Sequence, residues 1–165
     1  MSYFLGTHLN RLDAKGRVSV PALFRASLRA LANGAESGGS VILRPAHNRP
    51  CIEGWPFVVF QALTTPLERL DLFSQDREDL GVTLYADAYP VEPDKEGRIV
   101  LPSALVAHAR LTDGVAFLGM GQIFQIWEPA AAERRRDEAR EGTRSRGLTV
   151  PGLAPRPQAG GERGA

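Results

Sequence analysis

Hydrophobic residues alternate with polar ones at the start of the chain, and they take a helical spacing after position 20. The alternation predicts one strand over residues 3–12 and a second over residues 17–20, joined by a tight turn. The residues predicted to share a face are Leu5, Thr7 and Leu9 in the first strand, and Val18 and Val20, pointing inward, in the second. Arg17 and Ser19 then point outward, because successive side chains of a strand face opposite sides.

A helix is predicted directly after this second strand, over residues 21–32. Pro21 suits the first helical turn, where its missing amide hydrogen costs nothing, and Gly34 supplies a stop. The stripe predicted to face the core consists of Leu23, Phe24, Ser27, Leu28 and Leu31. Arg25 and Arg29 fall on the other face of this helix.

The remaining elements follow from the same spacing rules. Strands are predicted over residues 40–43, 51–55, 88–92, 98–101, 115–118 and 122–127. Helices are predicted over residues 56–69 and 76–85, with interruptions near Pro66 and Ser74, and over residues 102–111, and a last one begins at residue 129. The residues predicted to face inward in the third of these helices are Ala104, Leu105, His108 and Ala109. From Gly147 onward the Pro, Gly and Arg content predicts a disordered tail.

One short stretch occurs twice in the sequence. Asp13–Ala22 and Asp94–Ser103 both read Asp-x-x-Gly-Arg, then three strand-forming residues, then Pro and a small residue, at an offset of 81 positions (94 − 13). Each half of the chain therefore reads strand, turn, strand, helix, strand, strand, helix. A half of this size cannot close a core alone. The pattern predicts an α+β fold in which two halves pack about a pseudo-twofold axis.

Two of the predicted strands depart from a regular pattern. Pro90 and Pro93 interrupt the strand that opens the second half. Proline donates no hydrogen bond to a ladder, so this strand is expected at an edge or with a bulge. Cys51–Gly54 is less apolar than expected for a strand at that place.

The repeated stretch combines turn residues with an outward cation. Asp13 and Gly16 are predicted to shape the first turn, as are Asp94 and Gly97 the second, because Asp accepts from following amides and Gly accepts a positive φ. Arg17, at the start of an exposed strand, can reach a phosphate or read guanine O6 and N7 together. The alternative is that the Asp and Arg of each copy only pair across their own hairpin, an exposed contact worth about 0–1 kcal/mol.

The composition is that of a globular protein with a core, and its charge is nearly balanced. The 165 residues are 43% hydrophobic and 24% charged, with a formal net charge of +1. Residues 1–34 nevertheless carry five positive side chains against one negative, which is a modest indication of nucleic-acid binding. Cys51 is the only cysteine, which excludes an intrachain disulfide and a thiolate metal cluster.

The sequence shows no signal peptide, and its longest apolar runs are well short of the roughly 18 residues that span a bilayer. We expect a cytoplasmic protein with no membrane partner, no metal, no cofactor and no small-molecule substrate. An enzyme is disfavoured, because the motifs of serine hydrolases, phosphate-binding loops and zinc proteases do not occur. His108, on an apolar face, is expected to be a hydrogen-bonded core histidine.

The two copies of Asp-x-x-Gly-Arg, each followed by an apolar strand and Pro, resemble the MraZ family, over roughly Phe4 to Arg140. That family consists of two-repeat members of the AbrB/SpoVT-like, swapped-hairpin class of DNA-binding proteins. The resemblance implies a double-split β-α-β barrel of the swapped-hairpin type with peripheral helices. It divides the chain into a first repeat (4–58), a helical connector (59–86), a second repeat (87–130) and a C-terminal helix with a tail (131–165).

The resemblance also implies a function. It implies a regulator of the bacterial division and cell-wall gene cluster, nucleoid-associated, that binds short direct repeats of double-stranded DNA upstream of its own operon as a homo-oligomeric ring. The DNA contacts that it implies are Arg17, Lys15, Arg98, Lys95 and Arg11. The alternative is an interaction-only, antitoxin-like module that acts through a protein partner.

The two copies are expected to be unequal. The first has Lys15 in its turn and the basic helix of Arg25 and Arg29 behind it. The second has Glu96 in its turn and no comparable basic support. Arg17 is therefore expected to contribute more than Arg98.

Overall fold

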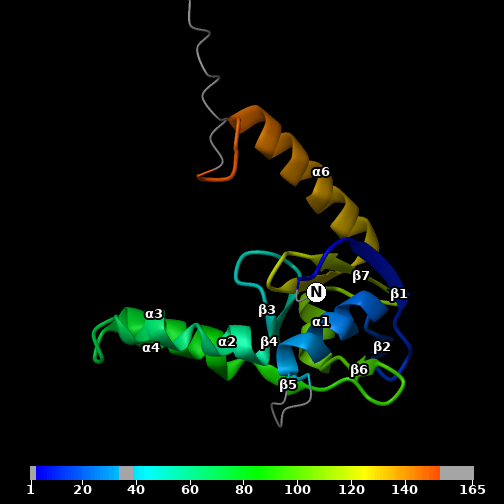
Figure 1. Cartoon of the computed structure of the whole chain (residues 1–165), viewed down its shortest axis with the longest axis horizontal. Coiled ribbons are helices and arrows are strands. Elements are labelled where there is room, and N and C mark those ends of the chain that lie inside the picture. Colours follow the sequence, from blue (N-terminus) through cyan, green and yellow to red (C-terminus); the bar gives the residue numbers. More distant parts are fainter. Residues whose placement is uncertain (1–2, 34–38, 153–165) are drawn as a thin grey trace, which may run out of the picture. The chain divides into compact units, whose positions relative to one another are not determined.

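Both halves of the chain fold into the same succession of elements (Figure 1). The computed structural model describes residues 3–33 and 39–152. The first half contains β1 (Thr7–Arg11), β2 (Arg17–Ser19), α1 (Ala22–Ala32), β3 (Val41–Pro45), β4 (Ile52–Pro56) and α2 (Phe57–Gln61). The second contains β5 (Tyr89–Val91), β6 (Arg98–Val100), α5 (Ser103–His108), β7 (Gly114–Gly119), β8 (Phe124–Trp127) and α6 (Pro129–Arg146). The succession predicted from the repeat is confirmed.

The described strands form a six-stranded antiparallel sheet and a separate two-stranded ribbon. The sheet has the order β1-β7-β8-β4-β3-β5, and the ribbon is β2-β6. If each strand is replaced by its counterpart in the other half, the same sheet order results, read from the opposite edge. The first strand of each half, β1 or β5, pairs with a strand of the other half. The described strands close no barrel. The structure therefore confirms a mixed α+β fold with pseudo-twofold strand order, in which β5, with Pro90, is an edge strand as expected.

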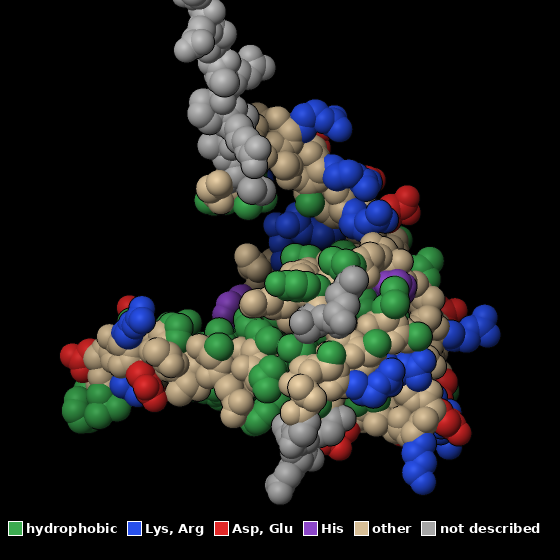
Figure 2. Space-filling view, in the orientation of Figure 1, with side chains coloured by type: hydrophobic (Ala, Val, Ile, Leu, Met, Phe, Trp, Pro, Cys, Tyr) green, Lys and Arg blue, Asp and Glu red, His purple; other side chains and the backbone are tan. Residues whose placement is uncertain are grey.

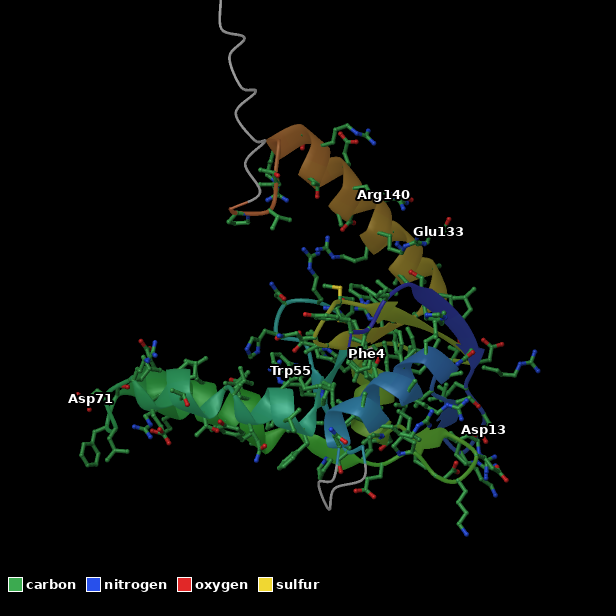
Figure 3. The ribbon with its side chains drawn as sticks, viewed as in Figure 1. Phe4, Asp13, Trp55, Asp71, Glu133 and Arg140 are labelled. Carbon is green, nitrogen blue, oxygen red and sulfur yellow. The ribbon has the colours of Figure 1, made fainter. Side chains whose placement is uncertain are left out.

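A group of buried aromatic side chains joins both halves. Phe4 and Phe24 meet edge to face with ring centroids 5.1 Å apart, and Phe124 lies 5.1 Å from Phe4 and 5.3 Å from Phe24. The inward residues of the ribbon, Val18 and Ile99, pack into the same core and are each 1% exposed. The alternation predicted for the ribbon strands is thus confirmed. Figure 3 shows Phe4 within this core and Asp13 at the periphery.

The low apolar content of β4 has a physical reason. A Cβ at Gly54 would lie 2.3 Å from the Phe124 ring, so the ring occupies the place of a side chain. Glu53 forms an ion pair with the buried Arg44 of β3. The strand therefore contributes space for a ring and a partner for a buried charge.

Some residues predicted to face the core lie at its margin instead. Phe24, Ser27 and Leu28 of α1 are buried, but Leu23 is 66% exposed. The buried stripe is narrower than the pattern predicted because the N-terminal part of α1 covers the core only along Phe24. The face of Leu5, Thr7 and Leu9 is the exposed face of β1.

The buried stripe of the corresponding helix in the second half is also narrower than predicted. In α5, Leu105 and the following Ala109 are buried as predicted. Ala104 is exposed and His108 only half-buried. The His108 imidazole bonds the Arg49 carbonyl oxygen at 3.1 Å, so it is hydrogen-bonded as expected but is not a core residue.

The connector between the halves is interrupted in its first helix and before Gln75, close to the places predicted, and its second helix is divided where no break was predicted. The helix expected over 56–69 divides into α2 and α3 (Thr64–Glu68), and that expected over 76–85 divides into α4 (Gln75–Gly81) and a π-helical segment, η1 (Val82–Ala86). At the base of the connector, the Phe60 ring lies edge to face with Trp55 at 6.4 Å and with Tyr85 at 5.6 Å. These aromatic contacts join the connector to β4.

The chain divides into two compact units, Met1–Ala132 and Glu133–Ala165. Ala132 is buried and belongs to the first unit, together with Trp127. The described part of the second unit is mostly helical, with exposed ion pairs along α6 such as Arg144–Glu141 at 3.1 Å. Most of the tail predicted to be disordered lies outside the described residues. Among the described residues, no helix has the length and apolar content needed to cross a membrane.

The aromatic core generates a first prediction. Phe24→Ala should lower the free energy of unfolding by about 3–5 kcal/mol, because it removes a ring that contacts both halves. Its neighbour Leu23→Ala should change this free energy by less than about 0.5 kcal/mol, since that side chain is exposed. Urea denaturation of both variants measures the difference. Equal losses would show that the two faces of α1 are assigned wrongly.

Candidate nucleic-acid interface

The first turn is built around the carboxylate of Asp13. Its Oδ1 accepts hydrogen bonds from the Lys15 amide at 2.9 Å and the Arg17 amide at 2.8 Å. Its Oδ2 accepts from Arg17 Nε at 2.7 Å. The Gly16 amide donates to the Asp13 carbonyl oxygen at 3.1 Å, and Gly16 has φ +80°, which suits glycine. One carboxylate thus closes the turn and orients the arginine.

The second turn repeats this geometry. Asp94 Oδ1 accepts from the Glu96 and Arg98 amides, both at 2.9 Å, and Gly97 has φ +79°. Arg98 Nε lies 3.4 Å from Asp94 Oδ2, a longer contact than in the first turn. Arg98 also has a second partner, because its Nη2 lies 2.5 Å from Glu96 Oε2. The two turns therefore share a backbone but differ in how their arginines are held.

These hydrogen bonds lower the pKa of both aspartates below the ordinary value of 3.8. For Asp13 the largest cause is the Arg17 amide, followed by the Arg17 side chain. For Asp94 the largest cause is the Arg98 amide, and the Glu96 amide adds to it. These donors bond the ionised carboxylate more strongly than the neutral carboxyl group, so they favour the ionised form.

The ribbon brings the two predicted arginines onto one surface. In the β2–β6 ladder, Arg17 lies opposite Val100 and Arg98 lies opposite Ser19. Because Val18 and Ile99 point into the core, these four residues share the outer face. Arg17 and Arg98 are then diagonal neighbours on it, a separation of about 7–8 Å between backbone positions. Figure 2 shows several Lys and Arg side chains, with Asp and Glu side chains among them, at this end of the first unit.

The other predicted contacts lie around this face. The strands are antiparallel, so the two turns, with Lys15 and Lys95, stand at opposite ends of the ribbon. Each turn is held against the end of the opposite strand by a backbone hydrogen bond. Leu101 N donates to Gly16 O at 2.8 Å, and Val20 N donates to Gly97 O at 2.9 Å. Both lysines are exposed. Arg11 is exposed at the end of β1, beside the Leu12–Val18 bridge that joins β1 to β2.

The basic helix supports the opposite turn from the one predicted. The sequence places α1 behind the first turn, but the antiparallel ribbon carries α1 to the second. A Cβ at Gly97 would lie 2.0 Å from Arg25 Nη1, so the guanidinium lies over this glycine. Arg25 and Arg29 line a pocket together with Asp94 and Lys95. The expectation that the second copy lacks basic support is therefore wrong.

The free hydrogen-bonding capacity differs between the two arginines. Among the described residues, Arg17 uses Nε for Asp13, and no hydrogen bond engages its Nη groups. A guanidinium held in this way presents two parallel donors to an acceptor pair, such as two phosphate oxygens or guanine O6 and N7. Arg98 has one Nη group engaged by Glu96. This difference favours Arg17 as the stronger contact, for a reason other than the position of the basic helix.

The pairing that the sequence offered as an alternative to DNA contact is present as well. Asp13 and Arg17 do pair across their own turn, but each is still more than one-third exposed. The pair therefore fixes the arginine without covering it. Sequence reasoning missed the position of Arg25, because helical spacing shows only the face of a residue and not the strand that lies opposite. No group of three or more His, Cys, Asp or Glu side chains within residues 3–33 and 39–152 is arranged to hold a metal ion.

Comparisons with known proteins agree over most of the chain. The family model described as "MraZ protein, putative antitoxin-like" matches residues 3–83 and 84–145. A Gluconacetobacter diazotrophicus protein named Transcriptional regulator MraZ is 64% identical over 151 residues, covering 92% of this chain and 93% of that protein. Proteins of the same name from Gluconobacter oxydans and Pelagibacter ubique are 58% and 38% identical, over 88% and 84% of this chain and 87% and 86% of their own length.

The turn geometry predicts a dependence of stability on pH. A carboxyl whose pKa is lower in the folded protein stabilises the fold above its ordinary value, here 3.8, and this contribution is lost as the pH falls. The variant with both Asp13→Asn and Asp94→Asn should therefore melt below the wild type at neutral pH. Between about pH 5 and about pH 2.5 its melting temperature should fall less than that of the wild type. Parallel curves over this range would contradict the assignment.

Proposed function

This chain belongs to the MraZ family, and from this premise we propose that it is a sequence-specific, DNA-binding transcriptional regulator. The observation that carries the proposal is the register of the β2–β6 ribbon. It places Arg17 and Arg98, one from each repeat, on a single exposed face. A two-stranded ribbon of this kind fits the major groove of DNA, where an arginine reads guanine. The role we propose is not enzymatic.

The proposed contacts have different tasks. Arg17 and Arg98, from the centre of the ribbon, would read base edges. Lys15 and Lys95, in the turns at its two ends, would contact phosphates, as would Arg11 beside the ribbon. A lysine is a compact charge suited to phosphate, whereas arginine presents a planar pair of donors. Asp13, Gly16, Asp94 and Gly97 would shape the turns without touching the DNA.

A single ribbon offers few contacts, so we propose that the protein acts as a homo-oligomeric ring on short direct repeats. Each protomer would add one weak site, and a high effective concentration would multiply these sites into useful affinity. A cyclic array presents its sites head to tail, which suits direct repeats. The target would lie upstream of the protein's own operon, in the division and cell-wall gene cluster, and the protein would act in the cytoplasm at the nucleoid.

Two structural assignments belong to this proposal. The exchange of first strands between the halves supports a relationship to the swapped-hairpin, AbrB/SpoVT-like class. The organisation that we propose is a first repeat over 4–58, a helical connector over 59–86, a second repeat over 87–130, and a C-terminal segment over 131–165.

The central test is the loss of Arg17. Arg17→Ala should weaken binding to DNA from the protein's own upstream region by about 5- to 140-fold per site, which corresponds to about 1–3 kcal/mol for a bidentate contact. Gel shifts with non-specific competitor measure this loss, while light scattering should show an unchanged oligomer mass. Arg144→Ala, in α6, is the matched control and should leave binding unchanged. Retained operator affinity in Arg17→Ala would contradict the proposed role.

The protein-partner alternative makes a different prediction for the same experiment. A wild-type protein with no preference for its upstream DNA, which instead captures a defined protein partner, would favour the antitoxin-like module.

Removal of Glu96 should change DNA binding in the opposite direction to removal of Arg17. Glu96→Ala should strengthen binding to the same DNA by about 2- to 5-fold, because it releases an Nη group of Arg98 and removes a negative charge near phosphates. The part of the gain that comes from releasing Arg98 should be lost in the Arg98→Ala background, so the effect should be smaller there, which a double-mutant cycle measures. A gain that persists in full without Arg98 would show that only the charge of Glu96 matters.

A further inference from the structure

A pocket of ≈ 180 Å³ lies beside the second turn. Its polar lining comes from two parts of the chain that are distant in sequence. Arg25 and Arg29 come from α1, and Asp94, Lys95 and Gly97 come from the turn before β6. The roles described above for the ribbon face and for the turn aspartates do not involve Arg25 or Arg29.

Arg25 lines this pocket, and one of its hydrogen-bond donors has no acceptor among the described residues. Its guanidinium packs over Gly97, where any Cβ would overlap it. Its Nε is inaccessible to solvent and has no hydrogen-bond partner among the described residues. A buried donor without an acceptor costs about 1–3 kcal/mol, more for a charged group. Arg25 as a whole is only half-buried and lines the pocket, so part of its side chain is open to a ligand there.

The charge of the pocket favours an anion. Three cationic side chains and one carboxylate leave it with two positive charges. The carboxylate, Asp94, is directed at its own turn, where both of its oxygens accept hydrogen bonds from Arg98 or the Glu96 amide. Arg29 and Lys95 are exposed and can move toward a ligand. Arginine and lysine together are typical of a phosphate site.

We propose that this pocket binds a phosphate group, and that its source is a backbone phosphate of DNA lying beyond the base pairs that the ribbon reads. The choice of DNA rests on the proposed function, because Lys95 belongs both to the pocket and to one end of the ribbon. A phosphate held here would be contacted from the helix and the turn at once. It would thereby fix where the ribbon stands along the duplex.

The pocket also breaks the pseudo-twofold symmetry of the interface. The repeat offset of 81 places Val106 of α5 at the position of Arg25 and Arg110 at that of Arg29 (25 + 81 and 29 + 81). The other end of the ribbon therefore has a valine where this end has the packed guanidinium. A symmetric ribbon reads DNA equally well in both orientations, whereas a phosphate contact at one end selects one. Direct repeats, which all point the same way, require such a selection.

The test compares two variants at pseudo-equivalent positions. Arg29→Ala removes a pocket cation, and Arg110→Ala removes its counterpart at the other end. Arg29→Ala should weaken binding to operator and to scrambled duplex equally, by about 5- to 10-fold, and should reduce the slope of log K against log salt by about 0.9. Arg110→Ala should match the wild type. Both side chains are exposed, so thermal melting should confirm that both variants are folded.

Ethylation interference then locates the contact on the DNA. In addition to the phosphates contacted by Lys15, Lys95 and Arg11, wild-type protein should show a sensitive phosphate that has no counterpart on the other side of each direct repeat, and Arg29→Ala should lose that phosphate alone. An unchanged salt slope in Arg29→Ala, or equal effects of the two variants, would overturn the proposal.

A titration with inorganic phosphate distinguishes the source of the ligand. The amide resonances of Lys95 and Gly97 should shift on addition of a short duplex in the wild type and should shift less in Arg29→Ala. If inorganic phosphate shifts them and no duplex binds, the pocket is a site for free phosphate, and both the DNA source and the proposed function fail. If duplex binds through Arg17 and neither probe shifts these amides, the proposed function stands and the pocket proposal fails.

Discussion

The pairing of β2 with β6 is the interaction on which the rest of the structure depends. It is one of the places where the two repeats meet strand to strand, and its backbone bonds tie each turn to the end of the opposite strand. Its inner residues, Val18 and Ile99, complete the core, and its outer residues form the candidate interface. A change in register by one residue would move the arginines inward and the core residues outward, because side chains alternate along a strand. The strand register that buries the core residues is therefore also the one that exposes the two arginines.

Much of this arrangement could be predicted from the sequence because it is local or repeated. The duplication predicted the element order, the alternation placed Val18 and Ile99 inward, and the Asp-x-x-Gly-Arg spacing predicted turns that the hydrogen bonds of Asp13 and Asp94 close. The rest depended on contacts between distant residues. The narrow buried stripe of α1, with Leu23 exposed, is set by what α1 covers.

The placement of the basic helix shows the limit most clearly. Sequence proximity puts Arg25 behind the first turn, yet the antiparallel ribbon carries it to Gly97 of the second. Only the pairing of two strands 81 positions apart determines this, and no local periodicity encodes it. The asymmetry predicted between the two copies does have a structural counterpart. Its origin is the second partner of Arg98, Glu96, and not a missing basic helix.

The Asp13–Arg17 pair has a thermodynamic consequence for any complex that this ribbon forms. A free arginine on a surface samples many rotamers, and fixing a side chain of this kind on binding costs about 0.5–1.5 kcal/mol. Here the carboxylate already restricts the guanidinium through Nε at 2.7 Å, so part of that entropy is lost during folding. In the proposed ring, the same restriction of Arg17 would be present in every protomer. The acidic residue of the turn, which by its charge opposes a phosphate, then favours association by lowering the entropy that each arginine has left to lose.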